Sequence, residues 1–232
     1  MPSDNWSPTH DQIVDLISAF YSSTGDRIEP NAPQLPVDAT SASIINLVEQ
    51  LTPDNIDSFH RWREAYFNLL FHSVVHNSYD LFSGLIRKGA DPTLANDKGT
   101  NVLHLLMKRG LIQWAEELLT SPKIKGEEAK VKFLNQGTAF GWTPLMAAAD
   151  GGQLEACKWL IKNGAQVNMS MSTGWTAMHS AAKKNIKDIV ALLLDNKGNK
   201  NILSAHRDFG RNLKVEDVTT DDDIIALLEK YK

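Results

Sequence analysis

Two stretches of the chain place apolar and polar residues in nearly the same order, 33 residues apart. The first reads Gly-Trp-Thr-Pro-Leu-Met-Ala-Ala-Ala from Gly141, and the second reads Gly-Trp-Thr-Ala-Met-His-Ser-Ala-Ala from Gly174. In each stretch small apolar residues recur at helical spacing, and a second apolar stripe follows a short polar break. The pattern predicts two helices per repeat, with successive repeats stacked to bury their apolar faces.

The residues at the ends of these helices agree with that prediction. Thr143 is suited to cap a helix, because its hydroxyl accepts a bond from a free backbone N–H, and Pro144 fits the first helical position. Gly152 and Gly164 are placed to end the first and second helix in left-handed turns. The second helix is expected to bury one stripe, with Trp159 packed between repeats: Ala156, Trp159, Leu160 and Ile161.

A period of 33 residues with this motif resembles the ankyrin-repeat family. The resemblance implies an all-α solenoid of helix-turn-helix repeats with β-turn fingers. It also implies that His104 and His179, at the histidine of the family's Thr-Pro-Leu-His motif, tie their turn to the adjacent repeat. The repeat that starts at Gly141 carries Met146 at this position.

The period sets the expected boundaries. Residues 1–65 are predicted to be a helical capping segment with helices near 10–21 and 41–51, and residues 66–232 to hold the repeats. Because apolar residues keep helical spacing and no glycine precedes residue 66, residues 54–76 are predicted to form one helix without a finger. The repeats are expected at 66–98, 99–140, 141–173 and 174–209, with a C-terminal cap at 210–232 in which Asp221 begins the last helix.

The repeat at 99–140 is nine residues longer than the period, and the excess lies in residues 121–134. Pro122 is expected to stop the preceding helix, and Glu127–Phe133 to form one or two extra helical turns. Insertions in repeat proteins fall in loops, often on the binding side. A tolerated loop and a binding element are both compatible with the sequence.

The composition excludes several functions. With 42% hydrophobic residues, 22% charged residues and a net charge of −4, the chain lacks the basic character of a nucleic-acid binder. It shows no apolar run long enough to cross a membrane, and its one cysteine, Cys157, fits a reducing compartment. The common catalytic motifs are missing, and His72 and His76 have no third ligand near them in sequence. No catalytic residue, cofactor or metal is therefore predicted.

What remains as a candidate is a binding surface on the turn tips and first helices, the concave face that holds partner proteins in the ankyrin family. Aromatic residues and methionine are enriched in interfaces, and four of five groove-facing charged positions are basic, Asp150 being the exception. Trp142 and Trp175 are expected to project in parallel. The alternatives are that the tryptophans pack against neighbouring turns and that the charged face is merely solvated. The predicted partner-binding residues are Phe140, Trp142, Met169, Met171, Trp175, Phe209, Lys108, Arg109, Lys183 and Lys184.

The sequence thus predicts a monomeric cytoplasmic scaffold that binds an acidic or amphipathic segment of a protein partner, without catalysis, nucleic acid or membrane insertion. The alternative is a host-directed bacterial effector, acting in the host cytosol, or a regulatory subunit. In that case the catalytic activity would lie in a partner or in residues 1–65.

Overall fold

The structure, a computed structural model, describes residues 46, 48–52, 56–57, 60–62, 65–206 and 210–231. The chain divides into two compact units. Unit 1 comprises residues 1–102 and 116–124, and unit 2 comprises residues 103–115 and 125–232. The helix predicted at 10–21 lies outside the described residues, whereas residues 46, 48 and 49 are helical, as the prediction for 41–51 requires.

Unit 1 contains a hairpin followed by a helix pair. Strands β1 (His60–Trp62) and β2 (Ala65–Phe67) pair antiparallel, with Arg61 opposite Tyr66. Helix α3 (Leu69–Val75) then packs against α4 (Tyr79–Arg87), and the pair buries Leu69, Phe71, Leu81, Phe82 and Leu85. A further finger in this unit is closed by a bridge between Ala95 and Asn101.

The hairpin shows that the predicted single helix over 54–76 is wrong. Ile56 and Asp57 lie in a turn, residues 60–67 hold the two strands, and the helix begins only at Leu69. The reason is Asn68, which has an extended backbone and accepts a hydrogen bond from the backbone N–H of Phe71 at 3.2 Å. A capping residue takes non-helical backbone angles, so a helix cannot run through Asn68, and aromatic residues such as Trp62 and Tyr66 suit strands as well as helices.

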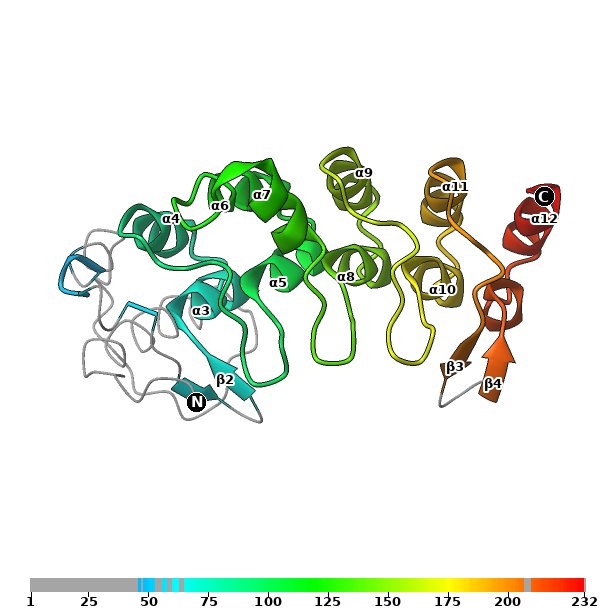
Figure 1. The fold of residues 1–232 in the computed structure, drawn as a ribbon, viewed down its shortest axis with the longest axis horizontal. Helices are drawn as coiled ribbons and strands as arrows, with labels where there is room; N and C mark the ends of the chain where they lie inside the picture. The colour runs from blue at the N-terminus through cyan, green and yellow to red at the C-terminus, as the bar shows by residue number, and fades with distance from the viewer. Residues whose placement is uncertain are drawn as a thin grey trace. The chain divides into compact units, whose positions relative to one another are not determined.

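Unit 2 is built from helix pairs in two rows. Helices α8 and α10 pack side by side, each packs against the second helix of its own pair, and the second helices α9 and α11 also touch (Figure 1). The 3₁₀ helix η1 continues the first row and α12 the second. Helix α5 lies in unit 2 except for its first residue, and α6 crosses the boundary between the units. The bounds are α5 (Val102–Arg109), α6 (Ile112–Leu118), α7 (Gly126–Leu134), α8 (Pro144–Asp150), α9 (Leu154–Lys162), α10 (Ala177–Lys183), α11 (Lys187–Asp195), β3 (Ser204–His206), β4 (Gly210–Leu213), η1 (Val215–Val218) and α12 (Asp222–Lys230).

The predicted all-α fold of helix pairs and fingers is thereby confirmed, and so are its end signals. Thr143 accepts the backbone N–H of Met146 at 3.3 Å, and Pro144 occupies the first turn of α8. Gly152 and Gly164 have φ of +71° and +96°, the left-handed conformation that ends each helix. At the other end of unit 2, Asp221 caps α12 by accepting two backbone N–H groups.

Alanine lets the first-row helices approach closely, since Ala147, Ala148 and Ala149 of α8 are almost fully buried, as are Ala181 and Ala182 of α10. In α9 the buried stripe is Ala156, Cys157 and Leu160, while Trp159 and Ile161 are only half-buried. The prediction that Trp159 belongs to the buried stripe is therefore wrong, whereas its packing between repeats stays a prediction. The repeat alignment itself holds, because the equivalent Leu192 is also half-buried and Leu160 and Leu193 are both buried. The buried face thus includes Cys157 in place of Trp159 and Ile161.

The predicted histidine ties are confirmed. The Nε2 atom of His104 lies 2.9 Å from the carbonyl oxygen of Trp142 in the next repeat. His179 uses both ring nitrogens: Nδ1 accepts from the backbone N–H and the hydroxyl of Thr176, and Nε2 lies 3.4 Å from the carbonyl oxygen of Leu213. Because Nδ1 accepts, the neutral ring carries its proton on Nε2 and donates it to Leu213.

A second set of hydrogen bonds between repeats was not predicted from the sequence. The side-chain amide of Asn135 donates to the carbonyl of Gly164 at 2.9 Å, and its oxygen accepts the backbone N–H of Gln166 at 2.7 Å. Asn168 makes the same two bonds 33 residues later, to Lys197 and Asn199. The recurrence of asparagine at the repeat period was the available signal. Each asparagine thus fixes the loop that follows the second helix of the next repeat.

We predict that acid destabilises the fold through His179. Burial lowers the pKa of His179 below its usual 6.5, and the hydrogen bond to Leu213 offsets only part of that effect. The unfolded chain therefore binds a proton first as the pH falls through about 6.5, so the contribution of the neutral ring is lost between that value and the lower folded pKa. Urea unfolding from about pH 7.5 to about pH 5.5 measures it.

The matched variant is His179→Met, which introduces the residue that α8 carries at the equivalent position 146. Wild type should exceed this variant in unfolding free energy at the higher pH, and the difference should shrink on acidification. A difference that is constant across the pH range would contradict the prediction.

Candidate protein-binding surface

The fingers of unit 2 repeat one geometry. In residues 138–142 the backbone N–H of the first residue donates to the carbonyl of the last at 2.9 Å, and residues 171–175 repeat this bond at 2.8 Å. Neighbouring fingers are joined as well, because the N–H of Ser172 donates to the carbonyl of Phe140 at 3.0 Å and that of Ala205 to Thr173 at 2.9 Å. The fingers thus form one hydrogen-bonded row, on the side of α8 and α10 opposite α9 and α11 (Figure 1).

Trp142 and Trp175 occupy equivalent positions but differ in exposure, and their parallel projection stays a prediction. Trp175 is only 5% exposed, and its indole N–H donates to the hydroxyl of Ser180 at 2.8 Å. Trp142 is half-buried. The physical difference lies on the following helix, where Ser180 has Ala147 as its counterpart, which offers no acceptor to Trp142. Lys183 lies over the Trp175 ring, 5.9 Å from its centroid.

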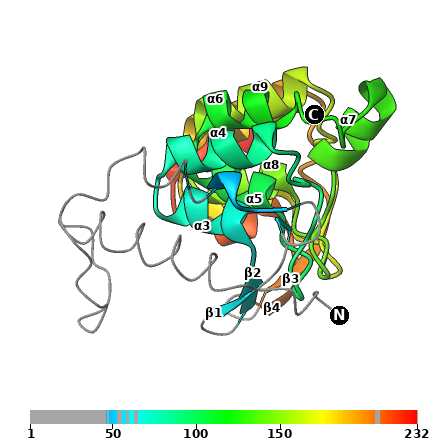
Figure 2. The same ribbon diagram turned by 90° about the vertical axis from the view of Figure 1, so that its left-hand side faces the viewer.

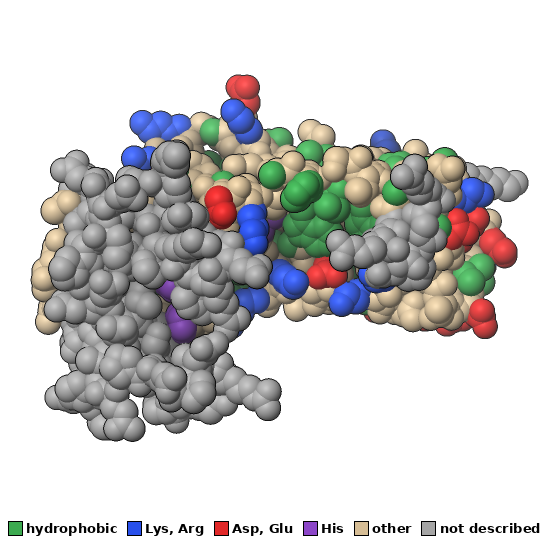
Figure 3. All heavy atoms as spheres, turned by 90° about the horizontal axis from the view of Figure 1, so that it is seen from below, with side chains coloured by type: hydrophobic (Ala, Val, Ile, Leu, Met, Phe, Trp, Pro, Cys, Tyr) green, Lys and Arg blue, Asp and Glu red, His purple; other side chains and the backbone are tan. Residues whose placement is uncertain are grey.

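Other predicted apolar contacts are accessible. Phe140 is 66% exposed, and Met169 and Met171 are half-buried. Phe209 lies outside the described residues. Figure 3, which views the molecule from the finger side, shows hydrophobic side chains gathered in a patch with Lys and Arg side chains next to it. The finger side therefore combines apolar and cationic groups.

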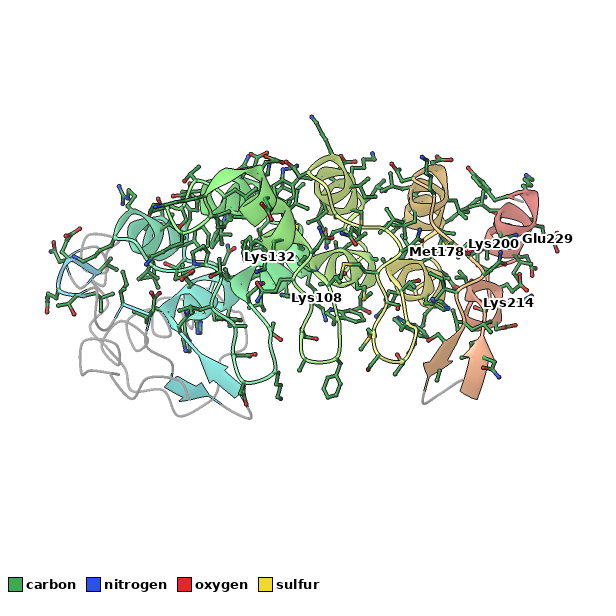
Figure 4. All side chains as sticks on the ribbon, in the orientation of Figure 1. Lys108, Lys132, Met178, Lys200, Lys214 and Glu229 are labelled. Carbon is green, nitrogen blue, oxygen red and sulfur yellow. The ribbon has the colours of Figure 1, made fainter. Side chains whose placement is uncertain are left out.

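The predicted basic residues stand at the ends of the first helices. Lys108 and Arg109 in the last turn of α5 and Lys184 after α10 are exposed, whereas Lys183 is half-buried. Asp150, the last residue of α8, forms ion pairs with Lys108 at 3.3 Å and with Lys184 at 3.8 Å. Figure 4 shows Lys108 on α5 toward α8. The ends of the first helices thus form a basic row, with the carboxylate of Asp150 in its middle.

The insertion contains a full helix. The expected extra turns are confirmed as α7, which buries Phe133 and Leu134 and sets Val131 against Gly164. Its outward positions, Glu127, Glu128 and Lys132, are charged and exposed. Figure 2 shows α7 beside α9 and not within the second row. The insertion is a packed element whose exposed face carries no large apolar residue.

The remaining candidates for chemistry are buried. His72 and His76 of unit 1 stack with ring centroids 6.0 Å apart, and no group of three or more metal-ligating side chains occurs within the described ranges. Burial raises the pKa of the Cys157 thiol to about 12, which keeps it protonated at neutral pH. None of the helices in the described part of the chain combines the length and the apolar character needed to span a bilayer.

Repeated helix pairs, capped by fingers and tied by histidine and asparagine, define a helical repeat protein. The family model for ankyrin repeats in three copies matches residues 69–169 and 123–204, more than half of the chain. The chain belongs to the ankyrin-repeat family.

Three relatives extend this finding. The chain is 24% identical over 198 residues to an ankyrin repeat protein of Acanthamoeba polyphaga mimivirus, a match that spans 71% of this chain and 25% of that protein. It is 26% identical over 173 residues to an ankyrin repeat protein of fowlpox virus, spanning 72% of this chain and 85% of that protein. It is also 33% identical over 104 residues to glycerophosphocholine phosphodiesterase of Schizosaccharomyces pombe, which spans 44% of this chain and 8% of the enzyme.

Proposed function

We propose that unit 2 binds a protein partner through its fingers and the ends of its first helices, without catalysis. The observation that carries the proposal is Phe140, a large aromatic side chain left 66% exposed on a finger whose backbone is hydrogen-bonded to the next finger. Apolar patches rimmed by polar residues, such as the one on the finger side, mark protein interaction sites, and aromatic residues are enriched in them (Figure 3). Membership of the ankyrin family, whose repeats suggest protein interaction, supports the same function.

The rigidity of the fingers favours tight binding. Phe140 and Trp142 lie on a backbone fixed by bonds within the finger and to its neighbour, so little conformational entropy is lost when a partner docks. The two methionines adapt their shape to the partner more readily than aromatic rings do. The lysines at the helix ends then steer an acidic or amphipathic segment onto this face.

We predict that Phe140→Ala and Trp142→Ala each weaken partner binding by about 2 kcal/mol, roughly thirtyfold, because both remove central apolar contact area. The partner is first isolated by cross-linking pull-down from eukaryotic lysate, and the purified pair is then measured by surface plasmon resonance. Circular dichroism confirms that each variant is folded.

The matched control is Trp159→Ala, which removes the same residue type from a half-buried position on α9, in the second row. It should bind as wild type does. Equal affinity of all four proteins would place the binding surface elsewhere, on α7 or in unit 1.

A regulatory subunit or a host-directed bacterial effector is the second candidate, and the match to a segment of a fungal phosphodiesterase favours the regulatory subunit. In this reading the catalytic activity lies in a partner or in residues 1–65. An activity assay on the purified partner distinguishes the two candidates, because a scaffold leaves the partner's turnover unchanged and a regulator alters it. For either, we propose a cytoplasmic monomer, or one in the host cytosol, since the single cysteine suits a reducing compartment.

A further inference from the structure

Asp150 breaks the charge pattern of the first helices. Lys108, Asp150 and Lys183 occupy equivalent positions of three successive repeats, in the last turn of α5, α8 and α10. The carbonyl end of a helix carries partial negative charge, so lysine suits this position and aspartate does not. The carboxylate of Asp150 thus stands where its own helix disfavours it, between repeats that carry a cation.

Two lysines compensate for this carboxylate. Lys108 pairs with one oxygen of Asp150 at 3.3 Å and Lys184 with the other at 3.8 Å. The side chain of Asp150 is 25% exposed, whereas those of Lys108 and Lys184 are 59% and 50% exposed. Both ammonium groups therefore face water and keep further N–H donors, since each has three. Two accessible cations converge on one partly covered anion.

We propose that Lys108 and Lys184 bind a carboxylate of an acidic partner segment, and that Asp150 is a built-in competitor for the same two ammonium groups. This inference rests on the proposed function of unit 2. The two lysines are complementary in charge to such a segment, and the incoming carboxylate binds the same two ammonium groups that Asp150 now engages. Asp150 also repels that carboxylate. The two lysines therefore bind an acidic group well only where the same partner segment also makes apolar contacts. Asp150 thereby sets selectivity by lowering affinity for charge alone.

A purely structural role for Asp150 leads to a different result. If its carboxylate only relieves repulsion between the lysines, Asp150→Asn lowers stability and leaves the affinity for acidic segments no higher than in wild type. If Asp150 competes, the same isosteric change raises that affinity. The sign of the change in affinity decides between the two roles.

The experiment measures fluorescence anisotropy of a fluorescein-labelled peptide of about twelve residues that alternates glutamate and leucine. Asp150→Asn is expected to bind this peptide about twofold to fivefold more tightly than wild type, the range for an exposed ion pair. Lys108→Gln and Lys184→Gln should each weaken binding by a similar factor, mainly through slower association. All effects should diminish at high salt.

The control is Glu155→Gln, which changes the net charge equally and also removes a carboxylate paired with a lysine, Lys158, at 2.7 Å on α9. It should leave peptide affinity unchanged. The inference is overturned if Asp150→Asn binds no more tightly than wild type, if Glu155→Gln tightens binding as much, or if neither wild type nor Asp150→Asn binds the peptide. If only Phe140→Ala weakens binding, the inference about Asp150 fails and the proposed function stands. If no variant of the finger or of the helix-end lysines and Asp150 changes the affinity for the purified partner, the proposed function fails as well.

Discussion

Gly174→Ala is expected to lower the free energy of unfolding by about 3–4 kcal/mol. Gly174 has φ of +82°, and forcing an L-residue into this region costs about 1–2 kcal/mol. In addition, the new Cβ would overlap the carbonyl oxygen of Leu203, a backbone atom that a rotamer change cannot move. Overpacking of this kind costs about 1–3 kcal/mol more, because the finger of one repeat must move away from the next.

Gly126→Ala is the matched control for this prediction. Gly126 has a similar φ of +79°, but a Cβ built there meets no atom within 4 Å. Its alanine variant should therefore lose only the backbone contribution of about 1–2 kcal/mol. Urea unfolding followed by circular dichroism measures both. Equal losses in the two variants would show that the fingers can separate at no cost, and would remove the argument for a rigid binding face.

The sequence predicts the repeats well where local signals and period agree. Thr143, Pro144 and Gly152 each carry their own chemical reason for a helix end, and all three act as predicted. The prediction failed at residues 60–67, where Trp62 and Tyr66 keep helical spacing although the chain forms a hairpin. Apolar periodicity does not separate helix from strand over so short a stretch. The decisive signal was the capping side chain of Asn68, which marks where the helix begins.

The binding surface was only partly predictable, because equivalent sequence positions have different neighbours. The alignment places Trp142 and Trp175 at equivalent positions, yet Trp175 is buried and donates to Ser180, whereas Trp142, with Ala147 at the position equivalent to Ser180, is half-buried. Similarly, the sequence marks Asp150 as an exception among basic residues, but only the structure shows that two lysines reach it. Repeat periodicity fixes backbone position, and the side chains packed around each position decide its exposure.

Trp175→Ala is expected to cost about 3–5 kcal/mol of unfolding free energy, as the truncation of a buried aromatic side chain does. The ring is 5% exposed and lies 5.1 Å from the ring of His179, so its loss leaves a cavity between the finger and α10. The change also removes the N–H that donates to Ser180, although that hydroxyl keeps its bond to the carbonyl of Thr176. The tryptophan thereby holds the finger against the helix that it precedes.

Trp159→Ala provides the comparison within the same unit. Trp159 is half-buried on α9, so its truncation should cost only about 1–2 kcal/mol, in proportion to the smaller apolar area it removes from water. Urea titrations of both variants, followed by tryptophan fluorescence and circular dichroism, test the difference between them. A smaller loss for Trp175→Ala than for Trp159→Ala would mean that Trp175 is exposed in solution. It would then return to the set of residues able to contact a partner directly, beside Trp142.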